Sequence, residues 1–281
     1  MLSTDGYIYL RIDDPLCAWN TYRGVIASAN VITTQPGCLS VWVAATIRRD
    51  ARSSRVIREC NLEKVRRQRY SDKVSRSWGI YTCIDKESAD RVQSLGEPHM
   101  TTENRAEINL SEARRTSTHD LNWITYHSDD IDSSWMDAYW TGEECPGHAP
   151  IWEKLVDGRV IVLGTQLREK AYSLVKAQFP ESLCLMEIAR IAAWVGSDVG
   201  SIAAFIIAKD DSFAVDYYLN MEEANDPTFV KKVADYMRLQ PVNREDIDPF
   251  ISKGTFGSTP DLRCYSLLKL KAELPYLADL L

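Results

Sequence analysis

The sequence lacks the features that mark several large classes of protein. Its 281 residues contain no apolar run approaching the roughly 20 residues that a membrane-spanning helix needs, so we expect no contact with a membrane. The first residues lack a basic segment followed by an apolar one, so we expect no export signal and a cytoplasmic location. Hydrophobic residues make up 45% of the chain and charged residues 26%, a composition typical of a soluble globular protein.

Cysteine and histidine are too few and too scattered to indicate a metal site. The seven cysteines are odd in number and include no C-x-x-C pair, and the four histidines include no H-E-x-x-H spacing. Structural zinc needs four clustered ligands, and a disulfide framework needs paired cysteines. We therefore expect reduced, mostly buried thiols and no metal.

Three common catalytic or nucleotide-binding motifs are also missing. Neither G-x-G-x-x-G nor G-x-x-x-x-G-K-[ST] occurs, and there is no G-x-S-x-G. The first two motifs hold phosphates against backbone N–H groups, and the third presents a nucleophilic serine. Their absence weakens the ordinary kinase, Rossmann and hydrolase interpretations.

The pattern of apolar residues changes near residue 165. Before it, β-branched and aromatic segments predict strands at 7–12, 24–33, 39–47, 75–84, 103–110, 121–126 and 159–163, with short helices at 62–70, 86–95 and 135–140. After it, the helical period predicts helices at 167–179, 183–195, 199–208, 213–224 (capped by Asp210 or Asp211), 228–239 and 262–274. The sequence thus predicts an α+β fold. A domain with a mixed, mainly antiparallel sheet occupies residues 1–165, and an all-α domain or layer occupies residues 166–281.

Charge is distributed unevenly, although the net charge is only −7. Residues 48–76 contain eleven Lys and Arg against four Asp and Glu, whereas residues 127–157 contain one Lys against eight Asp and Glu. The basic segment suggests contact with nucleic acid or an acidic protein surface. The candidate contacts are Arg48, Arg49, Arg52, Arg66 and Arg67. The alternative is that these side chains are solvated, or pair with the acidic segment of the same chain.

Four spaced features suggest a relationship to a known family. In chain order they are Glu63-x-x-Arg66, Ser75-Arg76, Tyr139-Trp140-x-Gly142 and Pro150-x-Trp152-Glu153-x-Leu155. In this order they resemble a little-characterised bacterial and phage domain family, which is itself similar to the ADP-ribosyltransferase superfamily. The resemblance covers about residues 1–165 and leaves the C-terminal part unexplained.

The resemblance implies cleavage of the bond between nicotinamide and ribose in NAD. That reaction develops an oxocarbenium ion, which a carboxylate facing the sugar stabilises. Glu153 is the expected catalytic carboxylate. The expected NAD-binding residues are Arg11 for the dinucleotide, Ser75 or Ser77 for the pocket, and Trp78 or Tyr81 for stacking on nicotinamide.

The sequence departs from the superfamily's pattern at two points, and other roles remain open for the candidate residues. Ile151 stands two residues before Glu153, where arginine-modifying enzymes carry an acidic residue, and the first strand has no histidine. Glu153 could instead be a surface residue beside an anchoring Trp152, and both candidate stacking aromatics could be core residues.

Three functional hypotheses follow from these observations. The leading one is an NAD-dependent ADP-ribosyltransferase, or a related NAD-cleaving enzyme, acting on protein or nucleic acid in a toxin, defence or phage–host setting. The alternative is a non-catalytic nucleic-acid or protein-binding module that uses segment 48–76. The third is an interaction protein with an apolar face formed by Tyr217, Tyr218, Phe229 and Tyr236, for which core packing is the competing explanation.

Overall fold

The computed structural model describes residues 3–127, 133–209, 212–251, 253, 257–271 and 274–281, and it confirms the α+β class. The α-helices are α1 Pro15–Arg23, α2 Ala29–Ile32, α3 Val41–Arg49, α4 Ser54–Arg69, α5 Lys86–Ser94, α6 Asn122–His127, α7 Ser134–Thr141, α8 Gln166–Gln178, α9 Leu183–Trp194, α10 Pro227–Leu239 and α11 Arg244–Ile251. The strands are β1 Gly6–Tyr9, β2 Val25–Ala27, β3 Cys38–Leu39, β4 Ile80–Cys83, β5 Arg105–Asn109, β6 Ala113–Asp120, β7 Trp152–Val162, β8 Ile202–Lys209, β9 Ser212–Leu219 and β10 Leu267–Lys271.

The longest strand, β7, organises the first sheet. Its first half pairs antiparallel with β4 and β6, and its second half pairs with β2 and β5. Because β5 also pairs with β1, and β1 with β4, the hydrogen-bonded path returns to β7. Gly158 sits where β7 changes partners, with φ +128°, and a Cβ there would lie 2.7 Å from Arg114 N. Only glycine adopts this backbone without strain.

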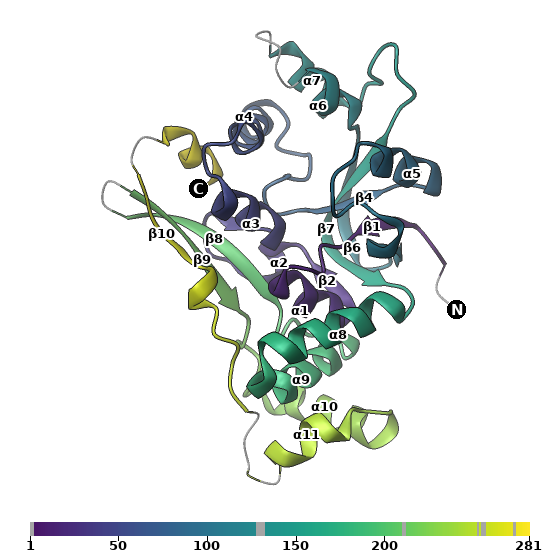
Figure 1. The fold of residues 1–281 in the computed structure, drawn as a ribbon, viewed down its shortest axis with the longest axis vertical. Helices are drawn as coiled ribbons and strands as arrows, with labels where there is room; N and C mark the ends of the chain where they lie inside the picture. Colours follow the sequence, from purple (N-terminus) through teal and green to yellow (C-terminus); the bar gives the residue numbers. More distant parts are fainter. Residues whose placement is uncertain (1–2, 128–132, 210–211, 252, 254–256, 272–273) are drawn as a thin grey trace.

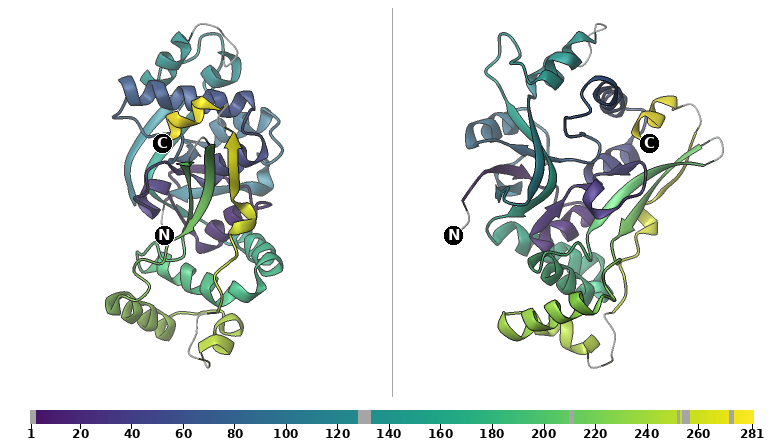
Figure 2. Two further views of the ribbon diagram at one scale, coloured as in Figure 1. Left: turned by 90° about the vertical axis from the view of Figure 1, so that its left-hand side faces the viewer. Right: turned by 180° about the vertical axis from the view of Figure 1, so that it is seen from behind.

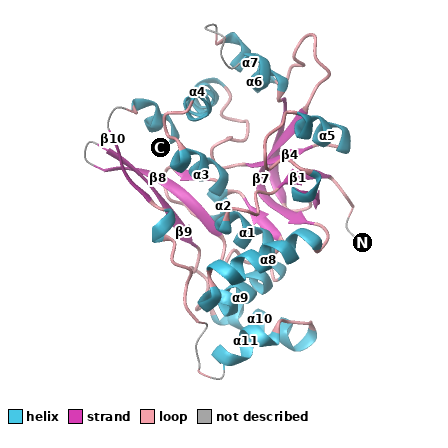
Figure 3. Ribbon diagram, viewed as in Figure 1, coloured by secondary structure: helices cyan, strands magenta, loops and turns pink. Residues whose placement is uncertain are grey.

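The second sheet has the order β10-β9-β8-β3 and lies on the other side of α1, α2 and α3 (Figures 1 and 3). The view from behind in Figure 2 shows the same separation of the two sheets, with helices α8 to α11 gathered at one end of the molecule. The largest apolar core joins α1, α3, α8 and α9 to strands β8 and β9. This shared core contains residues from both sides of residue 165, and the division into two domains at that position remains a prediction.

Several predicted helices are confirmed together with the residues that cap their ends. Asp85 caps α5, accepting a hydrogen bond from Ser88 N at 2.7 Å. Gly142 ends α7 in the left-handed conformation, with φ 83°. Asp226 caps α10, whose first residue is Pro227, a position where the missing N–H of proline leaves no helical hydrogen bond unmade.

Two predicted strands in the N-terminal part are helices. The segment 39–47 contributes only Leu39 to β3 and then forms α3, which begins at Val41 after its N-cap Ser40, whose Oγ accepts from Val43 N. The segment 121–126 falls on α6. A short apolar run fits the buried face of a helix as well as a strand, so a local capping residue decided the outcome for α3.

In the C-terminal part, predicted helices are strands, so this part is not all-helical. Segments 199–208 and 213–224 were predicted as helices, but they contain β8 and β9, paired antiparallel from Ile202↔Leu219 to Lys209↔Ser212. Their β-branched and aromatic residues suit a strand covered on both faces. Segment 262–274 likewise contains β10 rather than a helix. The predicted caps Asp210 and Asp211 lie outside the described residues.

Four further expectations concern the cysteines, an apolar face, a metal site and membrane contact. The seven cysteines are free thiols, four of them buried, as expected. Tyr217 and Phe229 are buried, so core packing accounts for them. Among the described residues, no cluster of three or more His, Cys, Asp and Glu side chains is arranged to hold a metal ion. No helix in the described part of the chain has the length and apolar character to cross a membrane.

Candidate functional site

A cavity of about 530 Å³ opens beside β4 and the start of β7. Its wall includes strand residues of β1, β4 and β7, the start of α3 and the first two turns of α4. Such a volume falls within the range of small-molecule sites. Most of the lining is apolar or aromatic, and the charged side chains at the wall are Arg11, Asp14, Arg55, Arg58, Glu59, Arg76, Glu97 and Glu153.

A buried arginine, Arg76, joins two of the wall carboxylates. Its Nε donates to Glu59 Oε2 at 2.7 Å and its Nη2 to Glu59 Oε1 at 3.1 Å, while its Nη1 bonds to Glu153 Oε1. Nη1 also donates to Tyr139 Oη at 2.7 Å, and that hydroxyl donates to Glu153 Oε1 at 2.8 Å. The three charged side chains are each at most 6% exposed. One guanidinium therefore neutralises part of a two-carboxylate cluster at the cavity wall.

Three different elements bring these groups together. Glu59 lies on the buried face of α4, Glu153 lies on β7 directly opposite Cys83 of β4, and Tyr139 lies on α7. Arg76 stands in the turn that precedes β4, where Gly79 N donates to Ser75 O at 2.9 Å. A Cβ at position 79 would lie 2.5 Å from that oxygen, so the turn requires glycine.

The two carboxyl groups have opposite pKa shifts. Burial raises the pKa of Glu153, and the opposing effects of Arg76 and Tyr139 do not cancel it. Burial acts in the same direction on Glu59, but Arg76, with help from Arg58 and Arg55, holds the pKa of Glu59 below its ordinary value. Carboxyl groups whose pKa values are driven apart are typical of sites where one stays ionised while the other exchanges a proton.

Glu153 keeps one oxygen available. Both hydrogen bonds that the described residues make to Glu153 use Oε1, held by Arg76 and Tyr139. The residue lines the cavity, and neither of these two bonds uses Oε2. Two donors on Oε1 fix the orientation of the carboxylate before a ligand arrives.

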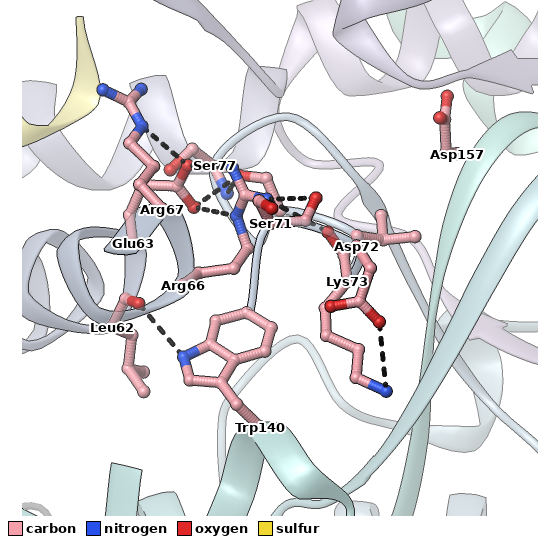
Figure 4. A network of polar contacts seen from close by, with 12 residues as sticks. Leu62, Glu63, Arg66, Arg67, Ser71, Asp72, Lys73, Ser77, Trp140 and Asp157 are labelled. Atoms are coloured by element: carbon pink, nitrogen blue, oxygen red, sulfur yellow. Dashed lines mark hydrogen bonds and ion pairs between the residues drawn. The ribbon is translucent and has the colours of Figure 1, made fainter. Parts of the chain in front are cut away.

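A second buried ion-pair cluster surrounds Glu63, one turn further along α4 (Figure 4). Glu63 is fully buried and accepts from Arg66 Nη2 at 2.8 Å and from Arg67 Nε at 3.1 Å. Ser75 Oγ donates to Glu63 Oε2 at 2.7 Å and accepts from Ser77 N at 3.0 Å. This cluster anchors the loop that carries Arg76, and it does not line the cavity.

The structure brings four of the six predicted NAD-site residues to one cavity. Glu153, Arg11, Trp78 and Tyr81 all line it. Glu153 is 5% exposed and lies within β7, rather than in a loop before a strand that was expected to begin at residue 159. The longer strand follows from its pairing with β6, which continues from Gly158 to Trp152.

The two predicted serines have a structural position instead. Ser75 and Ser77 are buried beside the cavity wall without lining it. Ser75 is occupied by its bond to Glu63, and it holds the Ser77 backbone. Their contacts support the loop that carries Arg76, and neither serine lines the cavity.

The predicted partner-binding arginines are divided between ion pairs and the surface. Arg66 and Arg67 pair with Glu63, and Arg48 Nη2 lies 3.2 Å from Asp14 Oδ2. Arg49 and Arg52 are exposed. Pairing with the acidic segment of the same chain, considered as the alternative, occurs elsewhere in the basic segment, at Arg69–Asp137 and Arg76–Glu153.

Sequence reasoning missed Glu59, Tyr139 and Arg55 as site residues. A signal for Glu59 was present: Glu59 and Glu63 are four residues apart in a strongly basic helix, a spacing that places both carboxylates on one face. Two acids on one face, next to buried apolar positions, indicate buried partners. The identity of the partner, Arg76, could not be read from the helix.

Comparison with known proteins identifies one related family. Residues 32–170 match the model of a family described as "Protein of unknown function (DUF2441)". No curated protein and no solved structure matches the chain. The matched segment contains Glu59, Arg76, Tyr139 and Glu153, whereas Arg11 lies before it. These comparisons give no evidence of similarity to the ADP-ribosyltransferase superfamily.

Proposed function

We propose that the cavity binds NAD and that Glu153 promotes cleavage of the bond between nicotinamide and ribose. The observation that carries this proposal is the convergence of Glu153, Arg11, Trp78 and Tyr81 on one cavity of about 530 Å³. A ligand there would find a carboxylate, aromatic faces and guanidinium groups, which suit a sugar, aromatic rings and phosphates respectively.

The chemistry follows from the orientation of Glu153. As the C–N bond breaks, its electron pair leaves with nicotinamide and positive charge develops on the ribose. Glu153 Oε2 would face that charge, while Arg76 and Tyr139 hold Oε1 in place. An acceptor nucleophile then forms a bond to the sugar carbon and releases a proton. Water as acceptor gives NAD hydrolysis, and a protein or nucleic-acid group gives ADP-ribosylation.

Trp78 and Tyr81 differ in how free their rings are to stack on nicotinamide. Tyr81 is committed to the Arg76 cluster, because its hydroxyl bonds to Arg76 O and its ring lies 4.8 Å from the Arg76 guanidinium carbon. Trp78 is partly exposed at the cavity. We therefore assign ring stacking to Trp78, and to Tyr81 the role of holding Arg76.

The experiment is release of nicotinamide from NAD by purified protein, followed chromatographically. We expect wild-type protein to release nicotinamide and Glu153→Gln to lose the activity by at least about a hundredfold, as for other groups that stabilise transition-state charge. Glu144→Gln, an exposed carboxylate in the loop after α7, is the matched control and should retain activity. Circular dichroism confirms that each variant is folded. Wild-type protein that releases no nicotinamide, or Glu153→Gln with wild-type activity, would overturn the proposal.

A further inference from the structure

Arg55 and Arg11, both at the cavity wall, have buried donors that the described residues leave without a hydrogen-bond partner. Arg55 stands in the first turn of this 16-residue helix. Its guanidinium carbon lies 4.8 Å from the centre of the Trp42 ring, and its Nη1 donates to Glu97 Oε1 at 3.2 Å. Its Nε is buried and makes no hydrogen bond within the described part of the chain. A donor of this kind is costly to bury unless something else accepts from it.

Arg11, two residues after the end of β1, also has a buried donor without a partner among the described residues. It lines the cavity, and its buried Nε also has no hydrogen-bond partner among the described residues. Its nearest counter-charge is Asp13, with Oδ1 3.4 Å from that Nε, too poorly aligned for a hydrogen bond. Two guanidinium groups on one cavity wall thus retain unused donor capacity.

Charges of both signs act on His99, which also lines the cavity. Burial is the main cause that lowers the pKa of His99; among its charged neighbours Glu97 has the largest effect and raises the pKa, Arg11 and Arg55 lower it, and Asp13 raises it. Both arginines therefore act on one point of the cavity wall. The N-terminus of α4 adds the positive end of a helix dipole. An anion here would accept from the unused guanidinium donors and face that dipole.

The two arginines and Glu153 are different parts of the cavity wall. Arg11 follows the end of β1, in a turn where Asp14 N donates to Arg11 O at 3.1 Å. Arg55 stands one turn before Glu59 on α4. Both hydrogen bonds that the described residues make to Glu153 come from Arg76 and Tyr139, so neither Arg55 nor Arg11 is committed to that carboxylate. One ligand in the cavity could therefore meet the carboxylate and the two guanidinium groups as separate contacts.

We propose that Arg55 and Arg11 form an anion subsite that binds a phosphate-type group of the cavity's ligand. A guanidinium presents its N–H groups in a planar fork that matches phosphate oxygens. The identity of the anion rests on the proposed function: if the cavity binds NAD, the anion is the pyrophosphate of NAD. The subsite itself requires only an anion.

The test uses inorganic pyrophosphate as the probe, with binding measured by isothermal titration calorimetry. We expect wild-type protein to bind it, and Arg55→Gln and Arg11→Gln each to bind at least about tenfold more weakly, the loss typical of one charge-assisted hydrogen bond. Arg55→Lys keeps the charge and should lose less. Arg49→Gln, an exposed arginine that does not line the cavity, is the matched control and should bind as wild type does.

The outcomes separate the subsite from the proposed function. Pyrophosphate binding that depends on Arg55 and Arg11, without any nicotinamide release, would support the subsite and remove the NAD-cleaving function. Absence of pyrophosphate binding by the wild-type protein, or an equal loss in Arg49→Gln, would overturn the subsite.

Discussion

Replacing Arg76 with methionine should strongly destabilise the fold. Arg76 makes a two-bond contact with Glu59, at 2.7 and 3.1 Å, and a further contact with Glu153, and these side chains are no more than 6% exposed. Methionine fills much of the volume but leaves both carboxylates buried without their counter-charge. Breaking a single buried ion pair costs about 3–5 kcal/mol. Since two carboxylates depend on Arg76, we expect a loss of about 4 kcal/mol or more at pH 7.

The pH dependence of that loss distinguishes electrostatics from packing. Without Arg76, Glu59 and Glu153 lose the main charge that opposes burial, and only the weaker effects of Arg58 and Arg55 on Glu59 and of Tyr139 on Glu153 remain. We therefore expect burial to raise the pKa of both carboxyl groups in this variant. A carboxyl group whose folded pKa exceeds its unfolded value favours folding below the unfolded pKa, and this contribution is lost as pH rises through the folded pKa. The deficit of Arg76→Met relative to wild type should therefore shrink as the pH is lowered from 7 toward 5.

The assay is urea unfolding followed by circular dichroism at several pH values. Arg69→Met is the matched control, because Arg69 pairs with Asp137 at the surface, with side chains 48% and 31% exposed. Exposed pairs of this kind contribute less than about 1 kcal/mol. A loss below about 1 kcal/mol in Arg76→Met, or a loss that does not change with pH, would refute the reasoning about the buried cluster.

Three further outcomes are expected. Gly158→Ala should lower the free energy of unfolding by about 2 kcal/mol or more, since φ is +128° and the new methyl would lie 2.7 Å from Arg114 N. The control is Gly164→Ala, with φ +80° and nothing within 4 Å, which should cost about 1 kcal/mol. Equal losses in the two variants would contradict this. Asp120→Asn should lose about 2 kcal/mol in urea unfolding, because the buried carboxylate accepts three backbone N–H bonds, and a loss under about 0.5 kcal/mol would count against it. Burial lowers the pKa of His119 to about 4, so His119 contributes stability above pH 6.5 that is lost as pH falls toward 4. His119→Gln should therefore lose less stability than wild type over that pH interval. Parallel pH profiles of the two proteins would disprove the assignment.

Local signals predicted the elements whose ends are fixed by nearby residues. The helix 86–95 was predicted because Asp85 caps it, and the helix 135–140 because Gly142 ends it. Segments 39–47 and 199–208 were assigned the wrong type, because an apolar run is compatible with a buried helix or a buried strand. A local cap, Ser40, decides the first case, whereas the second depends on pairing with segments far away in the chain, such as β8 with β3.

The candidate site shows the same division. Glu153 was expected from the resemblance, which implies a catalytic carboxylate in the feature Pro150-x-Trp152-Glu153-x-Leu155. Ser75 could not be separated from a ligand-contacting serine, because its partner Glu63 belongs to another element. Glu59 became a site residue only through Arg76, whose loop position is set by contacts that no sequence spacing reveals.

The most direct test of the central claim is a crystal structure of the Glu153→Gln variant soaked with NAD. The proposal predicts density for NAD in the cavity, with the ribose that carries nicotinamide within hydrogen-bond distance of the side chain at position 153 and a ring against Trp78. An empty cavity at saturating NAD, or NAD bound away from position 153, would contradict the account.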